Sequence, residues 1–360
     1  MLCTLLRLIH IRNMEDKSIE LLPGMTMLVG PNGCGKTNLL EAVYYSSVGK
    51  SFRTSNDQEM IALGEEDGTI LLTYKVHQVS HELKIKLSRQ QGKKLFLNDT
   101  PIKRKELMGL FRTVLFTPDE LQLIKGAPLF RRRFLDMEIS QVSPRYYETL
   151  IRYNRAVQQR NAEFRRAQFQ GRRPDVDMWD MQIASGAAYL VKKRWETIAK
   201  MNEKVPAMEA VLTSHQEQLQ ITYQQNEGEN QTANVEWYLK ALSDHRDEDA
   251  RLCRTSVGPH RDDLQFLMNG IDISAYGSQG QQRTAILAMK LAELEFIKEE
   301  TGTYPVLLLD DIGSELDTQR RKALMNYLQE QEIQTLLTGT EALSEAEGVH
   351  VEKLGMRSEE

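Results

Sequence analysis

Residues 30–37, GPNGCGKT, have the residue types and spacing of a loop that binds nucleotide phosphates. They match the pattern G-x-x-x-x-G-K-[ST], between an apolar segment typical of a strand and a segment typical of a helix. Backbone N–H groups in such a loop face the phosphates, and the helix N-terminus adds its dipole. The alternative is a chance glycine-rich turn, which the adjoining strand and helix, the lysine and the threonine together disfavour.

The same loop predicts which groups hold a nucleotide. Its glycines allow the backbone to curl, Lys36 is expected to reach the β- and γ-phosphates, and the Thr37 hydroxyl is expected to bind Mg²⁺. ATP and Mg²⁺ are therefore the predicted cofactors. The predicted cofactor-binding residues of the loop are Gly30, Pro31, Asn32, Gly33, Cys34, Gly35, Lys36 and Thr37.

Residues 306–311, VLLLDD, supply the second half of the predicted site. An apolar strand here would deliver Asp310 to its carboxyl end, where α/β sheets bind ligands. Asp310 is expected to hold Mg²⁺, and Asp311 to orient or deprotonate the attacking water, so the predicted catalytic residues are Lys36, Asp310 and Asp311. The alternative for the two aspartates is a turn that caps a helix. Because about three quarters of the chain separates Lys36 from Asp310, a large segment must be inserted between the two halves of the site.

Residues 276–283, YGSQGQQR, form a third segment of interest, although they contain no carboxylate, cysteine or histidine. They come just before a strongly predicted helix. Taken alone, the segment is a polar turn that caps this helix, with glycines for a tight backbone.

Length, charge and cysteine content limit the type of protein. The 360 residues are enough for two or three domains, or for one core with a large insertion. The net charge is −5, so a nucleic acid would have to bind a local basic surface. The 3 cysteines are dispersed without a CxxC pair, which indicates a reducing compartment, and we predict a cytoplasmic location. No apolar run reaches the ~18 residues of a membrane span, and the N-terminal segment reads as a strand rather than an export signal.

Hydrophobic periodicity outlines the elements that would position these segments. The α/β pattern appears at both ends of the chain, with a helical block between them. Residues 224–234 are predicted as a polar loop, and the tail after residue 341 as loosely held. The expected elements are strands up to residue 30, a helix over 38–48, an antiparallel β meander over 69–102, a helical hairpin over 143–215, a β hairpin over 264–273 with an Asn269-Gly270 turn, a helix over 281–300, a strand over 305–310, a helix over 318–330 and a strand over 333–338.

The predicted helical hairpin is rich in arginine over residues 145–173, where Glu148 and Glu163 are the acidic residues. On an acidic protein such a segment is a candidate DNA-binding surface, because arginine binds phosphates and releases counterions. The alternative is a solvated helix face with internal ion pairs. The predicted DNA-binding residues are Arg152, Arg155, Arg160, Arg165 and Arg166.

Taken together, the motifs resemble the ABC-type ATPases of the SMC and recombination-repair class, and within it the RecF family of bacterial recombination mediators. The order of phosphate loop, SQGQQ turn, LLLDD and SELD (314–317) is similar to the class. Other segments resemble the family over nearly the whole chain, to about residue 340: KSFR (50–53), RRRFLD (131–136), YNRAVQQRN (153–161) and SVGPHRDDL (256–264). The resemblance implies an α/β ABC-type P-loop ATPase head, with a mixed sheet and an antiparallel β subdomain, and an inserted, mainly helical lobe.

The family resemblance also implies a mechanism. Ser278, Gly280 and Gln281 of one copy would contact the γ-phosphate bound by a second copy, so ATP would close a homodimer. Such a dimer would act as a clamp on single-stranded, gapped or linear duplex DNA in recombinational repair, replication restart and the SOS response, with RecO and RecR as partners. The chain would then be a weak, DNA-dependent ATPase that serves a binding switch. Two departures suggest that its hydrolysis is slow: Asp311 replaces the usual glutamate, and the place of the switch histidine reads TGT (338–340). Thr338 or Thr340 is then the candidate substitute.

These expectations divide the chain into an N-terminal half of the ATPase lobe (1–120), an inserted helical lobe (121–250) and a C-terminal half of the ATPase lobe (251–360). A P-loop kinase for small molecules and the ATPase subunit of a membrane transporter are the alternative functions. The kinase leaves SQGQQ and SELD unexplained, and the arginine-rich insertion does not suit the transporter.

Overall fold

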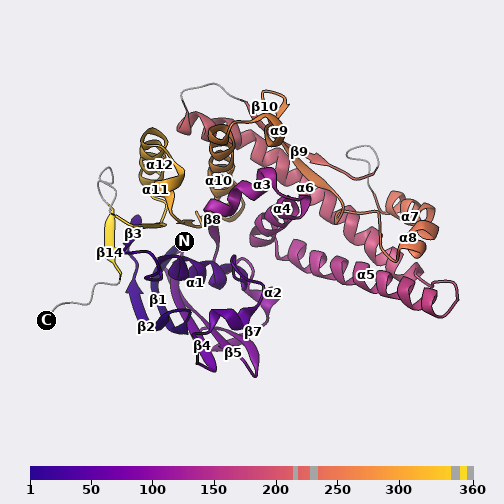
Figure 1. Cartoon of the computed structure of the whole chain (residues 1–360), viewed down its shortest axis with the longest axis horizontal. Coiled ribbons are helices and arrows are strands. Elements are labelled where there is room, and N and C mark those ends of the chain that lie inside the picture. Colours follow the sequence, from indigo (N-terminus) through magenta and orange to yellow (C-terminus); the bar gives the residue numbers. More distant parts are fainter. Residues whose placement is uncertain (214–217, 228–233, 342–348, 355–360) are drawn as a thin grey trace. The chain divides into compact units, whose positions relative to one another are not determined.

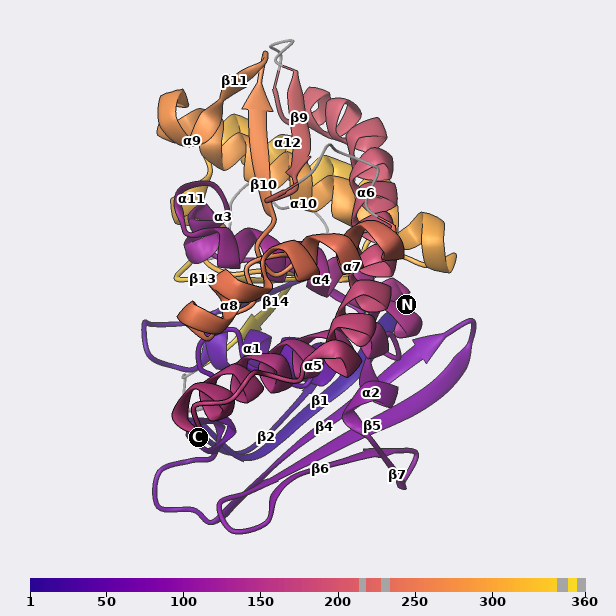
Figure 2. The same ribbon diagram turned by 90° about the vertical axis from the view of Figure 1, so that its right-hand side faces the viewer.

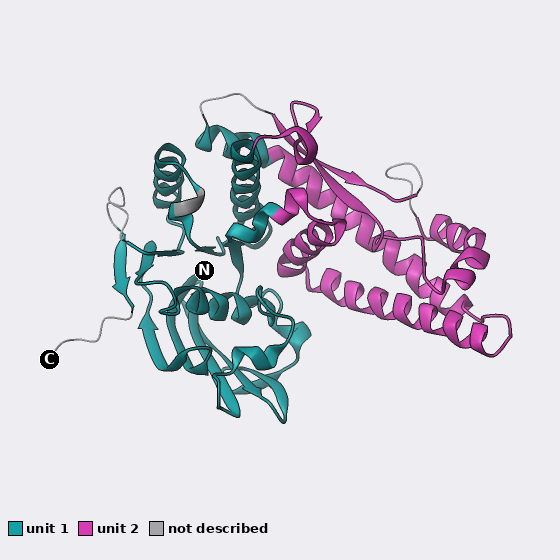
Figure 3. Ribbon diagram, in the orientation of Figure 1, with its two compact units in different colours: residues 1–121, 204–216, 279–360 teal, residues 122–203, 217–278 magenta. Residues whose placement is uncertain are grey.

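The computed structural model describes residues 1–213, 218–227, 234–341 and 349–354 (Figure 1). Two compact units are distinguished: unit 1 comprises residues 1–121, 204–216 and 279–360, and unit 2 comprises residues 122–203 and 217–278 (Figure 3). The first boundary lies next to the predicted residue 120, whereas the inserted unit ends at 278 instead of 250. The difference arises because β10 (Asp263–Met268) pairs with β9 (Leu219–Gln224), which draws the segment up to residue 278 into the insertion.

Unit 1 contains an antiparallel sheet with the strand order β2-β1-β4-β5-β6-β7. Alternate residues of β4 are buried, among them Ile70 and Leu72, and this period of two is the pattern that predicted a β meander. The meander is confirmed. The strands are β1 (Leu2–Ile11), β2 (Met14–Glu20), β4 (Asp67–Val76), β5 (Val79–Ser88), β6 (Gly92–Leu97) and β7 (Thr100–Ile102).

A second sheet of unit 1 is parallel and has the order β14-β3-β13-β12-β8. Its inner strands are apolar and buried, as expected for a sheet covered on both faces. The prediction of a loosely held tail is wrong for residues 350–353, because this polar segment pairs with β3 through its backbone, which hydrophobic periodicity does not reveal. The strands are β3 (Met25–Val29), β8 (Thr113–Phe116), β12 (Val306–Leu309), β13 (Thr335–Gly339) and β14 (His350–Lys353).

Helix α1 (Lys36–Val48) packs between the two sheets, with contacts to β4, β8 and β13. Figure 1 shows α10 (Gln279–Thr301) and α12 (Thr318–Glu330) on the other side of the parallel sheet. Most residues of α10 are buried, so this helix is apolar around much of its circumference. The short α11 (Ile312–Glu315) connects β12 to α12.

Unit 2 is built on the helical hairpin that the sequence predicted, formed by α5 (Pro144–Phe169) and α6 (Asp177–Leu212). Figure 2 shows β9 and β10 side by side, and β11 (Ile271–Asp272) follows through the predicted Asn269-Gly270 turn. Both turn residues have positive φ, 51° and 79°, as a tight hairpin requires. The sequence did not predict β9 or two helices, α7 (Val235–Asp244) and α8 (Arg246–Leu252). The remaining helices are α3 (Gln122–Lys125), α4 (Pro128–Val142) and α9 (Ile273–Tyr276).

A buried arginine organises the core of unit 2. The guanidinium of Arg194 donates to Asp136 Oδ1 at 2.8 Å, to Tyr223 Oη at 3.1 Å and to the Pro259 carbonyl at 2.7 Å. Its side chain is 2% exposed, so these partners must replace its hydration. The contacts hold α6 against α4, β9 and the GPHRDD segment. In the described part of the chain, no helix is long and apolar enough to cross a membrane.

Candidate functional site

The candidate nucleotide site lies at the carboxyl edge of the parallel sheet of unit 1. The phosphate loop follows β3, the two aspartates follow β12, and Thr338 lies near the carboxyl end of β13. Because β13 pairs with both β3 and β12, the three segments are neighbours at one edge. Open α/β sheets bind ligands at this edge.

The phosphate loop needs its glycines for two different reasons. Gly33 and Gly35 have φ values of 83° and 103°, which other residues rarely adopt. A Cβ on Gly35 would also lie 2.2 Å from Met14 Cε. At Gly30 the reason is close approach, since a Cβ there would lie 2.5 Å from the carbonyl oxygen of Leu354. The backbone that directly follows the edge strand β14, which the sequence did not predict, is therefore one reason for the first glycine.

Lys36 places its ammonium group inside the loop. Its Nζ donates to the carbonyl oxygens of Gly30 at 2.6 Å and Pro31 at 2.9 Å. Lys36 is also the first residue of α1, whose first turn contains no acidic side chain. The positive end of the helix dipole and the ammonium thus point to the same place, which suits a phosphate anion. Pro31, Asn32 and Gly33 are exposed, while Cys34 is partly buried.

The magnesium side of the site joins residues that are 273 positions apart. Thr37 Oγ1 donates to Asp310 Oδ1 at 3.0 Å, so the two residues predicted to hold Mg²⁺ lie side by side. A hydroxyl and a carboxylate oxygen are the hard ligands that Mg²⁺ prefers, so these two residues fit the ion. Asp311 is exposed and has a left-handed backbone with φ of 52°.

Asn13 supports the phosphate loop, although no sequence pattern predicted this role. Its Nδ2 donates to the Gly33 carbonyl at 3.1 Å, and its Oδ1 accepts from Asn38 Nδ2 at 2.7 Å. The turn between β1 and β2 is thereby tied to both the loop and α1. An isolated asparagine between two strands is an ordinary turn residue, so no local pattern could have identified it.

Glu41 forms a second support that sequence reasoning missed. The residue is completely buried, and its carboxylate accepts from Arg12 at 2.6 and 2.9 Å, from Arg53 at 3.4 Å and from the Ser51 hydroxyl. A buried carboxylate needs such partners. The one available signal was a glutamate between Leu40 and Ala42, in an apolar stretch of the predicted helix. The cluster fixes α1, and with it Lys36 and Thr37.

The SQGQQ turn is exposed at Ser278 and Gln279 and buried at Gln282, and its helix begins two residues earlier than expected. Ser278 is exposed and is the last residue of unit 2, whereas Gly280 and Gln281 lie in the first turn of α10 and belong to unit 1. Helix α9 before the turn is capped by Asp272, whose carboxylate accepts from the Ser274 N–H at 2.7 Å. The geometry is compatible with a phosphate at the α10 N-terminus. The role of the turn in a second copy stays a prediction.

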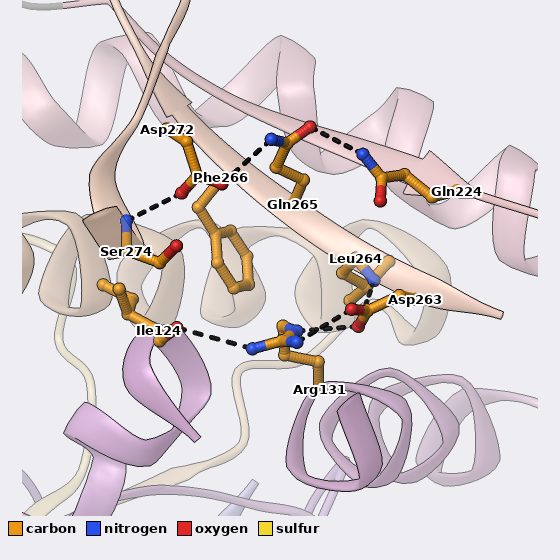
Figure 4. A pocket seen from close by; sticks show the side chains of 9 residues that line it. All are labelled: Ile124, Arg131, Gln224, Asp263, Leu264, Gln265, Phe266, Asp272 and Ser274. Atoms are coloured by element: carbon orange, nitrogen blue, oxygen red, sulfur yellow. Dashed lines mark hydrogen bonds and ion pairs between the residues drawn. The ribbon is translucent and has the colours of Figure 1, made fainter. Parts of the chain in front are cut away.

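A small pocket of about 90 Å³ lies beside α9 in unit 2 (Figure 4). Arg131 lines it and donates to both oxygens of Asp263, at 2.7 and 2.8 Å. On the other wall Gln265 donates to Asp272 at 2.9 Å, so the cap of α9 is fixed by β10. These polar groups form hydrogen bonds and an ion pair with one another, and through Asp272 they position α9, the helix that leads to Ser278. It also brings RRRFLD and GPHRDD into contact.

The predicted DNA-binding arginines have very different surroundings. Arg160 is completely buried and donates to Asp180 at 2.6 Å and to Asp249 at 2.5 Å, so the prediction that it contacts DNA is wrong. Its charge is already neutralised inside the protein. Arg152 and Arg166 are exposed and lie 3.4 Å from Glu148 and 3.8 Å from Glu163, respectively.

Two of the five arginines remain available. Arg155 and Arg165 are exposed on α5, and neither forms an ion pair with a described residue. Both interpretations of the arginine-rich segment therefore apply in part. Some of its arginines form ion pairs within the protein, and Arg155 and Arg165 form none with a described residue.

Comparison with known proteins places these features in a family. The family model described as RecF/RecN/SMC N terminal domain matches residues 3–352. A curated relative from Alkaliphilus oremlandii, DNA replication and repair protein RecF, is 41% identical and covers 93% of this chain and 92% of its own length. The protein of the same name from Clostridium beijerinckii is 40% identical over 92% of this chain and 90% of its own.

Solved structures show the same relationship. A structure described as the recombination mediator protein RecF-ATPrS in the RecFOR pathway has a TM-score of 0.90 and 31% identity, covering 98% of this chain and 96% of its own. A RecF-ATP structure matches equally well. An SMC head bound to a ScpA domain has a TM-score of 0.59 at 16% identity, which shows likeness of fold alone. The predicted ABC-type α/β ATPase fold with an inserted helical lobe is thereby confirmed.

Proposed function

The chain belongs to the RecF family of DNA replication and repair proteins, and we propose that it is an ATP-dependent DNA-binding protein that acts as a clamp. It binds single-strand gaps or junctions of duplex and single-stranded DNA during recombinational repair, replication restart and SOS induction. The observation that carries this proposal is the hydrogen bond between Thr37 and Asp310, which joins two halves of a nucleotide site across the inserted unit. The alternatives, a small-molecule kinase and a transporter ATPase, have no counterpart among the relatives quoted above.

ATP and Mg²⁺ are the proposed cofactors. The loop N–H groups and Lys36 bind the phosphates, and Thr37 and Asp310 hold the metal ion, which neutralises phosphate charge when bound. Asp311 orients the attacking water. Because its carboxylate is one methylene shorter than glutamate, it holds this water less well, and hydrolysis is slow. The enzyme activity therefore resets a binding switch.

ATP acts on the assembly of two copies of the chain. A ligand shifts an equilibrium only through contacts that differ between the two states. Ser278, Gly280 and Gln281 of one copy supply these contacts to the γ-phosphate held by Lys36 of the other. The exposure of Ser278 supports this arrangement. ATP binding closes the homodimer, and hydrolysis opens it.

DNA is bound through the arginines of α5 that remain exposed. Arg155 and Arg165 carry uncommitted charge, with Arg152 and Arg166 beside them on the same helix. Such contacts attach to the phosphate backbone and position the protein without reading base sequence. RecO and RecR are the proposed protein partners, because a related structure is described as part of the RecFOR pathway.

A gel-shift assay on gapped DNA, with and without ATP, tests the proposal. The wild-type protein should bind the DNA more tightly when ATP and Mg²⁺ are present, and Lys36→Met should lose this difference. Equal binding with and without ATP would overturn the clamp, and absence of DNA binding would favour the kinase or transporter.

A further inference from the structure

Thr338 lies in the middle of the candidate nucleotide site, at the carboxyl edge of the parallel sheet. Its strand, β13, pairs with β3 on one side and β12 on the other, so Thr338 lies between the strand of the phosphate loop and the strand of the aspartates. Its side chain is almost completely buried, with a residue exposure of 1%. A buried hydroxyl needs hydrogen-bond partners, and its choice of partners shows what it does.

The hydroxyl of Thr338 contacts both aspartates. It donates to Asp310 Oδ1 at 2.7 Å and accepts from the Asp311 N–H at 2.9 Å. The first bond fixes the carboxylate that faces Thr37. The second fixes a peptide group at a residue with left-handed backbone, a conformation that costs energy outside glycine.

The number of protons on a hydroxyl decides between two roles for Thr338. A threonine hydroxyl has one proton to donate and two lone pairs. At Thr338 the proton goes to Asp310 and one lone pair takes the Asp311 N–H, so no donor is left for a phosphate oxygen. A substitute for the switch histidine would have to offer the γ-phosphate a donor. Thr340, the other candidate, is exposed, and its hydroxyl takes no part in these bonds.

We propose that Thr338 is a positioning residue that sets both Asp310 and Asp311 for Mg²⁺ and water, and that it does not contact the γ-phosphate. Thr37 and Thr338 donate to the same oxygen, Oδ1, and together orient the Asp310 carboxylate so that Oδ2 is used in neither bond. The inference rests on the proposed function, since it assumes that ATP and Mg²⁺ bind at this edge.

Nucleotide titrations in Mg²⁺ and in EDTA test this role, because they separate metal-dependent from metal-independent affinity. A fluorescent ATP analogue is titrated into the wild type, Thr338→Val and Thr338→Ser. Loss of a group that orients a metal ligand typically costs about 10- to 100-fold in metal affinity. Thr338→Val should therefore lose at least about tenfold of the affinity gained from Mg²⁺ while its affinity in EDTA stays within about twofold of the wild type. Thr338→Ser, which keeps the hydroxyl, should show the same increase in nucleotide affinity with Mg²⁺ as the wild type.

Thr26→Val is the matched control, because Thr26 is a completely buried threonine of β3 whose hydroxyl has no hydrogen-bond partner among the described residues. Thermal melting checks that each variant folds, and if Thr338→Val does not fold, the same titrations on Thr338→Ala decide. A Thr338 variant that keeps the full Mg²⁺-dependent gain, even with a lower melting temperature, overturns the positioning role alone. A wild-type protein that binds no nucleotide overturns the proposed function as well.

Discussion

The candidate nucleotide site in unit 1 and the clusters around the buried arginines of unit 2 use charged residues in opposite ways. In unit 2, Arg160 and Arg194 are completely or almost completely buried, and several acceptors surround each guanidinium. In unit 1, Lys36 and Asp310 lie at the end of a sheet, beside an exposed loop and an exposed Asp311. Charges that the protein satisfies internally stabilise the fold, whereas charges held at an open edge can bind a ligand.

The same contrast appears within a single helix. Arg155 and Arg160 both lie on α5, yet one is exposed and the other is 0% exposed. Five positions on a helix correspond to a rotation that takes a side chain from solvent to core. Residue type alone therefore does not distinguish a DNA contact from a structural ion pair. Substitutions on the two kinds of charged residue should therefore have different consequences.

Lys36→Met should abolish saturable ATP binding, because it removes the ammonium that the loop carbonyls hold in place. Equilibrium dialysis with labelled ATP measures this. Lys94→Met, a change at an exposed lysine of β6, is the matched control and should bind ATP as the wild type does. Retained ATP affinity in Lys36→Met would refute the assignment of the phosphate loop.

Arg160→Met should destabilise the protein by about 3–5 kcal/mol, because it removes the guanidinium that pairs with the buried carboxylates of Asp180 and Asp249. Asp180 keeps its second ion pair, with Arg246. Chemical denaturation measures the free energy of unfolding. Arg155→Met is the matched control on the same helix and should change stability by less than about 0.5 kcal/mol. Similar losses in the two variants would remove the distinction between the buried and exposed arginines.

His260 should make unit 2 less stable at acid pH. Burial lowers the pKa of His260 to about 4, although its Nε2 lies 3.1 Å from the Thr255 carbonyl. A histidine in the unfolded chain has a pKa of ~6.5. Between the two pKa values, the unfolded chain therefore binds more protons than the folded protein does. The contribution of His260 to stability is therefore present above pH ~6.5 and is lost as the pH falls toward about 4, by on the order of 3 kcal/mol.

Melting temperatures measured across this pH range test the prediction, with His260→Gln as the reference. The wild type should lose more stability on acidification than the variant does. Parallel pH profiles would show that His260 does not titrate differently in the folded and unfolded states.

Removing the two uncommitted arginines should have the smallest effect, and an effect on DNA binding alone. The double variant Arg155→Ala/Arg165→Ala should bind DNA several-fold more weakly and should melt as the wild type does. The slope of the logarithm of the binding constant against the logarithm of the salt concentration should become less steep by about one for each arginine removed. Arg7→Ala is the control, because this exposed arginine is already paired with Asp16 in unit 1. An unchanged salt dependence would place the DNA surface elsewhere.

Much of the nucleotide site could be predicted because its motifs are local. GPNGCGKT follows a strand and opens a helix, VLLLDD combines a strand with a turn, and the parallel sheet then brings Thr37 and Asp310 within 3.0 Å. The meander and the helical hairpin followed from periodicity. Asn13 and Glu41 could not be found in this way, because their roles come from the packing of the β1–β2 turn and Ser51 against α1.

The wrong prediction for Arg160 and the missed strand β14 also arise from contacts that a local pattern does not show. Arg160 was assigned to DNA because a run of charge shows nothing about the distant Asp249 that neutralises it. The edge strand β14 was missed because backbone pairing, not apolar side chains, holds it to β3. Contacts between residues far apart in sequence decide both cases.

In the proposed dimer, a second copy of the chain completes each nucleotide site, and mixing two variants tests this. Lys36→Met lacks a working phosphate loop, and Ser278→Arg lacks a working signature turn. Analytical ultracentrifugation with ATP and Mg²⁺ should detect no dimers of either variant alone. The mixture should form heterodimers, because one of its two sites combines the intact loop of the Ser278→Arg copy with the intact turn of the Lys36→Met copy. ATP-driven dimers of Ser278→Arg alone, at the level of the wild type, would contradict the account.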